Sequence, residues 1–195
     1  DLHSTSRRQR QMCIRDRTQL VVCLLFQYAG MSFVDFAHLK ERNIKNGILD
    51  YNRQKTGTPM RLEILDTAEL MRKELMGDKK PASGYLFPFL SGTKTGYEAY
   101  LEYNAALSRF NRNLKALKKA AGIASDVTSY TIRHSFAMAL KEQNVPIEMI
   151  SELLGHKSIK TTQIYLRSFS LEKMTEVNST CLLYTSPSPR DSTSS

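Results

Sequence analysis

The segment 43–65 places the strongest constraint on the fold, because it is the one stretch with a clear strand pattern. Its sequence is NIKNGILDYNRQKTGTPMRLEIL, in which a Lys-Thr-Gly turn separates two apolar runs: Ile48, Leu49 and Tyr51, then Met60, Leu62 and Ile64. Such runs around a turn predict a hairpin or a three-stranded antiparallel sheet. The rest of the chain has helical apolar spacing, so we predict a mainly α protein with a small antiparallel β-sheet, an α+β fold.

Capping residues, prolines and glycines divide the remaining chain into helical segments. Ser32, Asp66 and either Thr128 or Ser129 are the expected helix N-caps, and Gly77, Gly122 and Gly155 the expected ends. The predicted helices are 18–28, 32–40, 67–76, 97–121, 130–143 and 147–154, with shorter pieces at 158–166 and 170–178.

The charge balance favours a polyanionic partner. The chain has a formal net charge of +9 and a pI near 9.5, which is typical of proteins that bind nucleic acid. One face of the predicted helix 97–121 contributes Arg109, Arg112 and Lys115. These cations are candidate DNA contacts, although a run of this kind is often only a solvated helix face.

Cysteine usage and hydropathy restrict the cellular setting. Cys13, Cys23 and Cys181 form no CxxC pair and have no metal-ligand spacing, so we expect no metal and a reducing, cytoplasmic compartment. No apolar run approaches the roughly 18 residues that span a bilayer. We therefore expect no membrane association.

Both ends of the chain look foreign. Residues 12–17 (MCIRDR) and 181–186 (CLLYTS) can be encoded by opposite strands of a single DNA sequence, as in a translated sequencing adapter. We therefore expect 1–17 and 181–195 to be adapter-derived and 18–180 to be the native part, with further sequence missing upstream. An ordinary disordered tail is the alternative for the polar C-terminal residues.

The most specific motif lies between residues 129 and 166. Arg133 and His134 open the run RHSFA, Leu-Gly-His ends at His156, and Tyr165 follows nine residues later. This order resembles the C-terminal signature of tyrosine recombinases, the phage integrase family. The wording of GMSFVDF and GHKSIKTTQIYL resembles integrases of Bacteroidetes mobile elements in particular.

The resemblance implies a recombinase catalytic domain that needs neither a metal nor another cofactor. Tyr165 would attack a DNA phosphodiester and form a 3′-phosphotyrosine, while Arg133 and His156 contact the phosphate. An arginine suits this task because its rigid fork pairs with two phosphate oxygens. An amphipathic core tyrosine and a lone polar loop histidine are the alternative interpretations of Tyr165 and His156.

Three further residues match the family's motifs less directly. Lys55, in the turn RQKTGT, corresponds to the lysine that protonates the departing 5′ oxygen, but a solvent-exposed turn lysine would look the same. Tyr130 stands where many members have histidine, and could donate a hydrogen bond without carrying a charge. His134, beside Arg133, fits a structural hydrogen-bonding role better than a reacting one.

Ala29 departs from the family pattern, because an arginine usually stands directly before the Gly-Met-Ser-Phe segment. A missing cation should slow the reaction severely. Three explanations stay open: another recruited cation, an inactive relative, or a shifted correspondence. Asp35 fits the acidic residue that follows in the motif, and Lys40, Arg42 and Lys55 are the first candidates for the recruited cation.

The leading functional hypothesis is therefore a site-specific recombinase that acts on double-stranded DNA, as family members do in homo-tetramers, in the bacterial nucleoid. A catalytically impaired DNA-binding relative is the alternative. An RNA-binding basic domain would explain the charge but not the ordered Arg, His and Tyr. The TTQIY context argues against a type IB topoisomerase.

Overall fold

The structure, a computed structural model, describes the backbone of residues 2–77 and 84–166. Side chains are described from Ile14 onward within these ranges, with the exception of Tyr165. The chain divides into two compact units, Asp1–Tyr165 and Leu166–Ser195. The fold and the site described below belong to the first unit.

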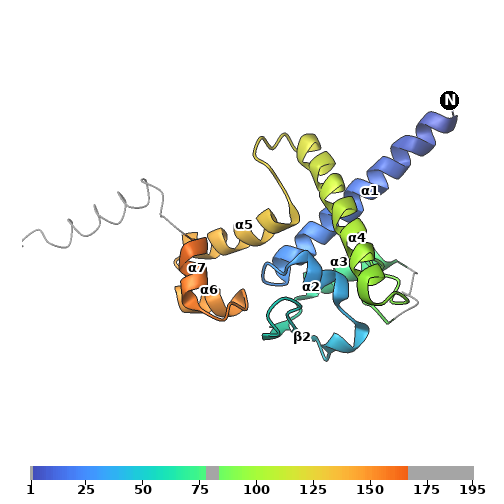
Figure 1. Cartoon of the computed structure of the whole chain (residues 1–195). Helices are drawn as coiled ribbons and strands as arrows, with labels where there is room; N and C mark the ends of the chain where they lie inside the picture. Colours follow the sequence, from blue (N-terminus) through green and yellow to red (C-terminus); the bar gives the residue numbers. More distant parts are fainter. Residues whose placement is uncertain (1, 78–83, 167–195) are drawn as a thin grey trace, which may run out of the picture. The chain divides into compact units, whose positions relative to one another are not determined.

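Helices dominate this unit, as predicted (Figure 1). The elements in chain order are α1 Leu2–Gln27, α2 Phe33–His38, the 3-10 helix η1 Glu41–Asn43, β1 Ile44–Lys45, β2 Ile48–Asn52, β3 Pro59–Glu63, α3 Asp66–Met76, α4 Gly96–Ala120, α5 Ser129–Glu142, α6 Ile147–Leu153 and α7 Ile159–Tyr165.

The three strands form one antiparallel sheet in the order β1-β2-β3, which confirms the predicted α+β fold. Tyr51 pairs with Met60 and Asn52 with Pro59 at the end of the β2–β3 hairpin. The loop that follows is closed by two backbone bonds, from Arg53 N to Thr58 O (2.9 Å) and from Gly57 N to Arg53 O (2.8 Å). The hairpin loop therefore presents a short, fixed run of residues beyond the sheet.

The core of this unit surrounds α1 and α2. Helix α1 packs against α3, α4 and α5, as expected of a helix that is apolar nearly all round. Aromatic rings stack next to it: Phe33 on Phe110, with ring centroids 4.6 Å apart, and Phe36 on Phe87, at 4.1 Å. Such pairs stabilise a core beyond the area that they bury.

Several predicted boundaries differ from the observed ones. Helix α1 begins at Leu2 rather than at residue 18, so it includes most of the segment 1–17. The Ser32 hydroxyl does not cap the backbone of α2 but donates to the Asp35 carboxylate (2.5 Å), and α3 has Leu65, not Asp66, at its N-cap. The predicted helix 170–178 and the segment 181–195 lie outside the described residues.

Tyr28 provides a test of the core. Its ring is 2% exposed, and its hydroxyl has no hydrogen-bond partner among the described residues. A buried donor left unpaired costs about 1–3 kcal/mol, so Tyr28→Phe should raise the free energy of unfolding by about 1 kcal/mol. Tyr28→Ala, which also removes the ring, should instead lower it by about 3–5 kcal/mol. Urea denaturation measures both, and a clear loss in the phenylalanine variant would contradict the assignment.

Candidate active site

Two buried arginines from distant parts of the chain meet at the C-terminal end of α6. Arg53, in the hairpin loop, donates from Nη1 to Leu154 O (2.9 Å) and Gly155 O (3.1 Å). Arg133, on α5, donates from Nη2 to the same Leu154 oxygen and from Nη1 to Gly30 O (2.9 Å). The carbonyls at a helix end lack intrahelical partners and carry partial negative charge. They can therefore hold two guanidiniums side by side.

Asp35 also holds the hairpin loop in place, through contacts with Arg53 and Gln54. Its carboxylate is 2% exposed; Oδ2 accepts from Arg53 Nε (3.4 Å) and Ser32 Oγ (2.5 Å), and Oδ1 accepts from the backbone N of Gln54 (2.7 Å). A buried carboxylate needs such partners to remain charged. Asp35 thus positions Arg53 and the loop that carries Lys55.

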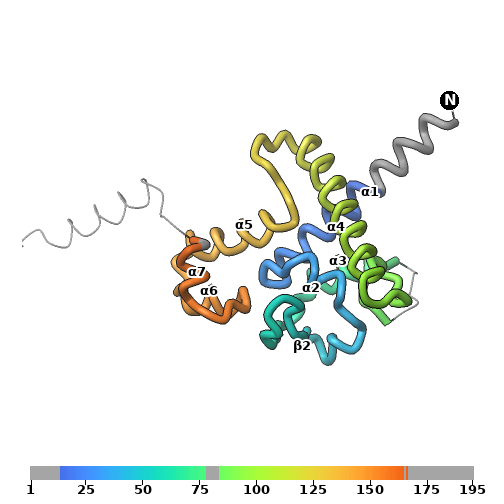
Figure 2. The backbone as a smooth tube through the Cα atoms, in the orientation of Figure 1, coloured from blue at the N-terminus to red at the C-terminus, as the bar shows by residue number. Residues whose placement is uncertain are grey.

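A glycine allows the arginine, the hairpin and α6 to approach closely. Gly155 has a φ of 61°, and a Cβ there would lie 2.5 Å from Met60 Sδ and 2.7 Å from Arg53 Cδ. The bend after α6 therefore requires a residue without a side chain, both for its left-handed backbone and for space. Figure 2 lets the reader follow how α6 and the hairpin of β2, far apart in sequence, lie side by side.

His156 follows this bend and lies next to the two arginines. Its Nδ1 is 2.8 Å from Oγ1 of the fully buried Thr162, and its backbone N donates to Ser151 O (3.0 Å). Burial, and then the positive charges of Arg133 and Arg53, lower the pKa of His156 from 6.5 to about 4. The imidazole is therefore neutral near pH 7, where it can donate a hydrogen bond but adds no charge.

The depressed pKa predicts how the fold responds to acid. The unfolded chain takes up the His156 proton near pH 6.5 and the folded chain only near pH 4. Stability from this residue is thus complete above pH 6.5 and is lost as the pH falls toward 4. NMR titration of the ring should give a midpoint below 5. In His156→Gln, the loss of stability between pH 6.5 and 4 should be smaller, and an ordinary midpoint near 6.5 would contradict the geometry.

The other predicted residues lie on the hairpin loop, α5 and α7. Lys55 is exposed in the hairpin loop, two residues after Arg53. Tyr130 is 62% exposed in the first turn of α5, one turn before Arg133. Tyr165 is the last residue of α7, and its side chain lies outside the described part of the chain.

Ala29 precedes the glycine that Arg133 contacts. It is buried, with a left-handed φ of 55°, and the next carbonyl, Gly30 O, accepts from Arg133. We call Arg53, Arg133, Asp35 and His156 the arginine cluster. Among the described residues, the cations Lys40, Arg42 and Lys55 make no hydrogen bond or ion pair with it. The cation that the fold brings beside Arg133 is Arg53. Sequence reasoning missed it, although its place two residues after Tyr51 on one side of a strand indicated burial.

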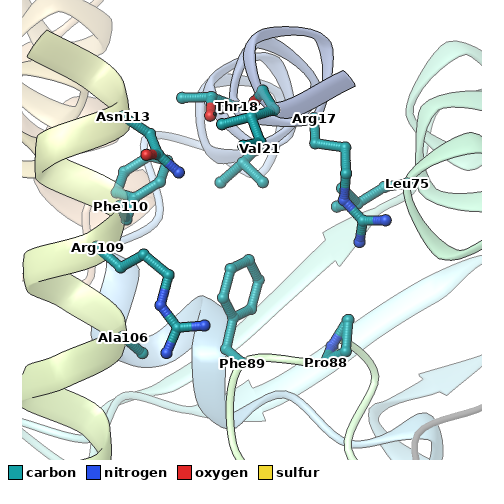
Figure 3. Close-up of a pocket in the computed structure, with 11 residues that line it drawn as sticks. Arg17, Thr18, Val21, Leu75, Pro88, Phe89, Ala106, Arg109, Phe110 and Asn113 are labelled. Carbon is teal, nitrogen blue, oxygen red and sulfur yellow. Dashed lines mark hydrogen bonds between the residues drawn. The ribbon is translucent and has the colours of Figure 1, made fainter. Parts of the chain in front are cut away.

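Arg109, Arg112 and Lys115 are exposed on α4, apart from the arginine cluster. No hydrogen bond or ion pair joins these three side chains to the cluster within the described ranges. Arg109 of α4 and Arg17 of α1 line a pocket of about 200 Å³ whose apolar wall includes Phe89 and Phe110 (Figure 3).

The described residues contain no group of three or more His, Cys, Asp and Glu side chains that could hold a metal ion. None of the helices in this part of the chain is long and apolar enough to cross a membrane.

Comparison with known sequences identifies a family. The model of the phage integrase family matches residues 4–172. The tyrosine recombinase XerA of Pyrococcus furiosus is 34% identical over 158 residues, which cover 79% of this chain and 50% of the relative. XerD of Lacticaseibacillus casei is 52% identical over 54 residues, covering 28% and 18%. The chain therefore spans at most half the length of these relatives.

Solved structures share the fold. XerH recombinase bound to its palindromic difH substrate superposes with a TM-score of 0.60 at 22% identity, covering 85% of this chain and 46% of that one. The Tn1549 transposon integrase in complex with a circular intermediate DNA gives a TM-score of 0.59 at 16% identity, with coverages of 82% and 57%.

Proposed function

Because the chain belongs to the phage integrase family of tyrosine recombinases, we propose that it cuts and rejoins DNA in site-specific recombination, through a covalent link to Tyr165. The observation that carries this proposal is the convergence of Arg53 and Arg133 on one carbonyl oxygen, Leu154 O, with His156 close by.

This cluster can offer a hydrogen-bond donor to an anion. Its charged side chains include two guanidiniums and the buried carboxylate of Asp35, and the depressed pKa of His156 keeps that ring neutral. Arg53 Nη2 makes no hydrogen bond to any residue that the structure describes. A phosphodiester oxygen would accept from this Arg53 donor, and preorganised donors of this kind stabilise the charge that grows in the transition state.

The proposed reaction balances without a cofactor. The Tyr165 oxygen forms a bond to the phosphorus as the bond from phosphorus to the 5′ oxygen breaks, which gives a 3′-phosphotyrosine and a 5′ hydroxyl. The phenol loses its proton, and Lys55 supplies one to the departing 5′ oxygen. Arg53, Arg133, His156 and Tyr130 act as donors to the phosphate oxygens. Rejoining is the same reaction in reverse.

The wider setting is also a proposal. Exposed Arg109, Arg112 and Lys115 would add phosphate contacts on double-stranded DNA, with four copies assembled on two duplexes. The phrases GMSFVDF and GHKSIKTTQIYL support an integrase of a Bacteroidetes mobile element, acting in the nucleoid. We further propose that 18–180 is the native catalytic part of a longer protein.

A trapping experiment tests the proposed function. Nicked half-site DNA should give an adduct with the complete parent protein that survives denaturing electrophoresis, because the leaving strand diffuses away before rejoining. The adduct should hold the DNA through a 3′ phosphate. A protein that binds this DNA without any adduct would instead be the catalytically impaired relative that Ala29 suggests.

A further inference from the structure

A polar pocket of about 360 Å³ adjoins the candidate active site, because Asp35 belongs to both. We call it the side pocket; its lining includes Asp35, His38, Lys40, Arg42, Gln54 and Tyr85. Asp35 and Gln54 also support the active site. Gln54 follows Arg53 in the sequence, and its backbone N donates to Asp35 Oδ1 (2.7 Å). The side pocket and the arginine cluster therefore share one carboxylate.

The lining of the side pocket contains two cationic side chains, Lys40 and Arg42, and one carboxylate, Asp35. Lys40 Nζ lies 5.4 Å from the centroid of the Tyr85 ring, and neither Lys40 nor Arg42 forms an ion pair within the described part of the chain. The one carboxylate in the lining, Asp35, already accepts from Arg53, Gln54 and Ser32. Two cations without an ion-pair partner among the described residues, in a polar pocket, favour an anionic ligand.

His38 lines this pocket, and its ring is held by neighbouring groups. Its Nδ1 is 2.7 Å from Val34 O, and because a carbonyl can only accept, this nitrogen carries a proton. The ring is also packed near Tyr85 and Tyr103, with centroids 6.3 and 5.7 Å apart. The orientation of the His38 ring is therefore fixed, so its signals can report a ligand in the pocket.

We propose that the side pocket binds a second phosphate of the same DNA, near the one held by Arg53 and Arg133. The proposal rests on the proposed function, because it needs DNA at the arginine cluster. A DNA strand presents one phosphate for every ~3.4 Å along the helix axis, so a strand held at the arginine cluster carries further phosphates on either side of the held one. Lys40 and Arg42 would neutralise this phosphate, and the side-chain amide of Gln54 would donate a hydrogen bond to it.

The salt dependence of binding tests this pocket. The probe is a short DNA duplex of arbitrary sequence, bound to the full chain at several salt concentrations. Each lost phosphate contact reduces the slope of log K against log salt by about 0.9, so Lys40→Gln plus Arg42→Gln should make the slope shallower by about 1. The matched control, Lys73→Gln plus Lys118→Gln, removes two cations already paired with Glu69 and Asp126 and should leave the slope unchanged.

Other outcomes separate the alternatives. An unchanged slope in the pocket variant, or an equal change in the control, overturns the second phosphate site while the proposed function stands. A chain that forms no complex with the duplex at low salt overturns both. Inorganic phosphate, followed through the His38 ring signals, should bind with a Kd weaker than about 1 mM. Tighter binding with no change in the DNA slope would assign the pocket to a free anion and contradict the proposal.

Discussion

Tyr165→Phe is expected to abolish the covalent protein–DNA adduct. The substitution removes the one oxygen that could bond to phosphorus from this residue, and loss of a nucleophile commonly costs roughly 10⁴-fold or more in rate. Denaturing electrophoresis of the parent protein with nicked half-site DNA measures the adduct. Binding of the same DNA before denaturation should be unchanged, because the phosphate contacts come from other residues.

A matched control uses another tyrosine of this chain. Tyr97, which is 73% exposed on α4, can be changed to phenylalanine without touching the arginine cluster, and this variant should form the adduct normally. If Tyr165→Phe were as active as the wild type, the nucleophile would lie elsewhere. Tyr130, in the first turn of α5, would then be the next residue to replace.

Arg53→Lys is expected to lower the rate of adduct formation by about 10²–10³-fold, the usual cost of a preorganised donor to a developing charge. A lysine keeps the positive charge beside Asp35, but one ammonium cannot reproduce the fork that contacts Asp35, Leu154 and Gly155 together. Single-turnover trapping measures the rate. Arg61→Lys, an exposed change on β3, is the control and should have no effect.

A lysine at position 53, in contrast to an alanine, separates an effect on the reaction rate from an effect on stability. Arg53→Ala would leave Asp35 as a buried charge without its ion-pair partner, which typically costs 3–5 kcal/mol of stability. A loss of activity in that variant could reflect unfolding alone. Arg53→Lys should retain most of the thermal stability, so a large fall in rate together with a small shift in the melting temperature identifies a role at the phosphate.

Ala29→Arg distinguishes a recruited cation from a missing one. If Arg53 serves the phosphate, an added arginine should change adduct formation little, and the larger side chain at this buried position should cost about 1–3 kcal/mol of stability. An inactive relative would instead gain a measurable adduct. Such a gain would contradict the assignment of Arg53.

The sequence predicted the parts of this molecule that depend on local patterns. The hairpin followed from alternating apolar residues around a turn, and α4 from amphipathic spacing ended by Gly122. The order of Arg133, His156 and Tyr165 identified the family, which the comparisons confirm. Periodicity and short motifs are properties of neighbouring residues, so one sequence suffices to detect them.

The identity of the second arginine could not be predicted in this way. Whether Arg53 or Lys40 reaches Arg133 depends on the path of the chain between β2 and α6, and no local pattern encodes that path. The hydroxyl of Ser32 is a similar case, because the nearby Asp35 side chain competes with the helix backbone for it. The start of α1 was also missed, because residues 1–17 were interpreted as adapter-derived and left out of the predicted fold.

The contacts of the two arginines can form only after most of the chain has been synthesised. Arg53 and Leu154 are separated by 101 residues, and Arg133 and Gly30 by 103. Contacts of such long range form late, because the intervening chain must be closed into a loop first. A ribosome-bound or prematurely terminated product that lacks α6 has no carbonyl to hold the guanidiniums together. Under the proposed function, an incomplete chain would therefore lack the arranged pair of guanidiniums and could not hold a DNA phosphate between them.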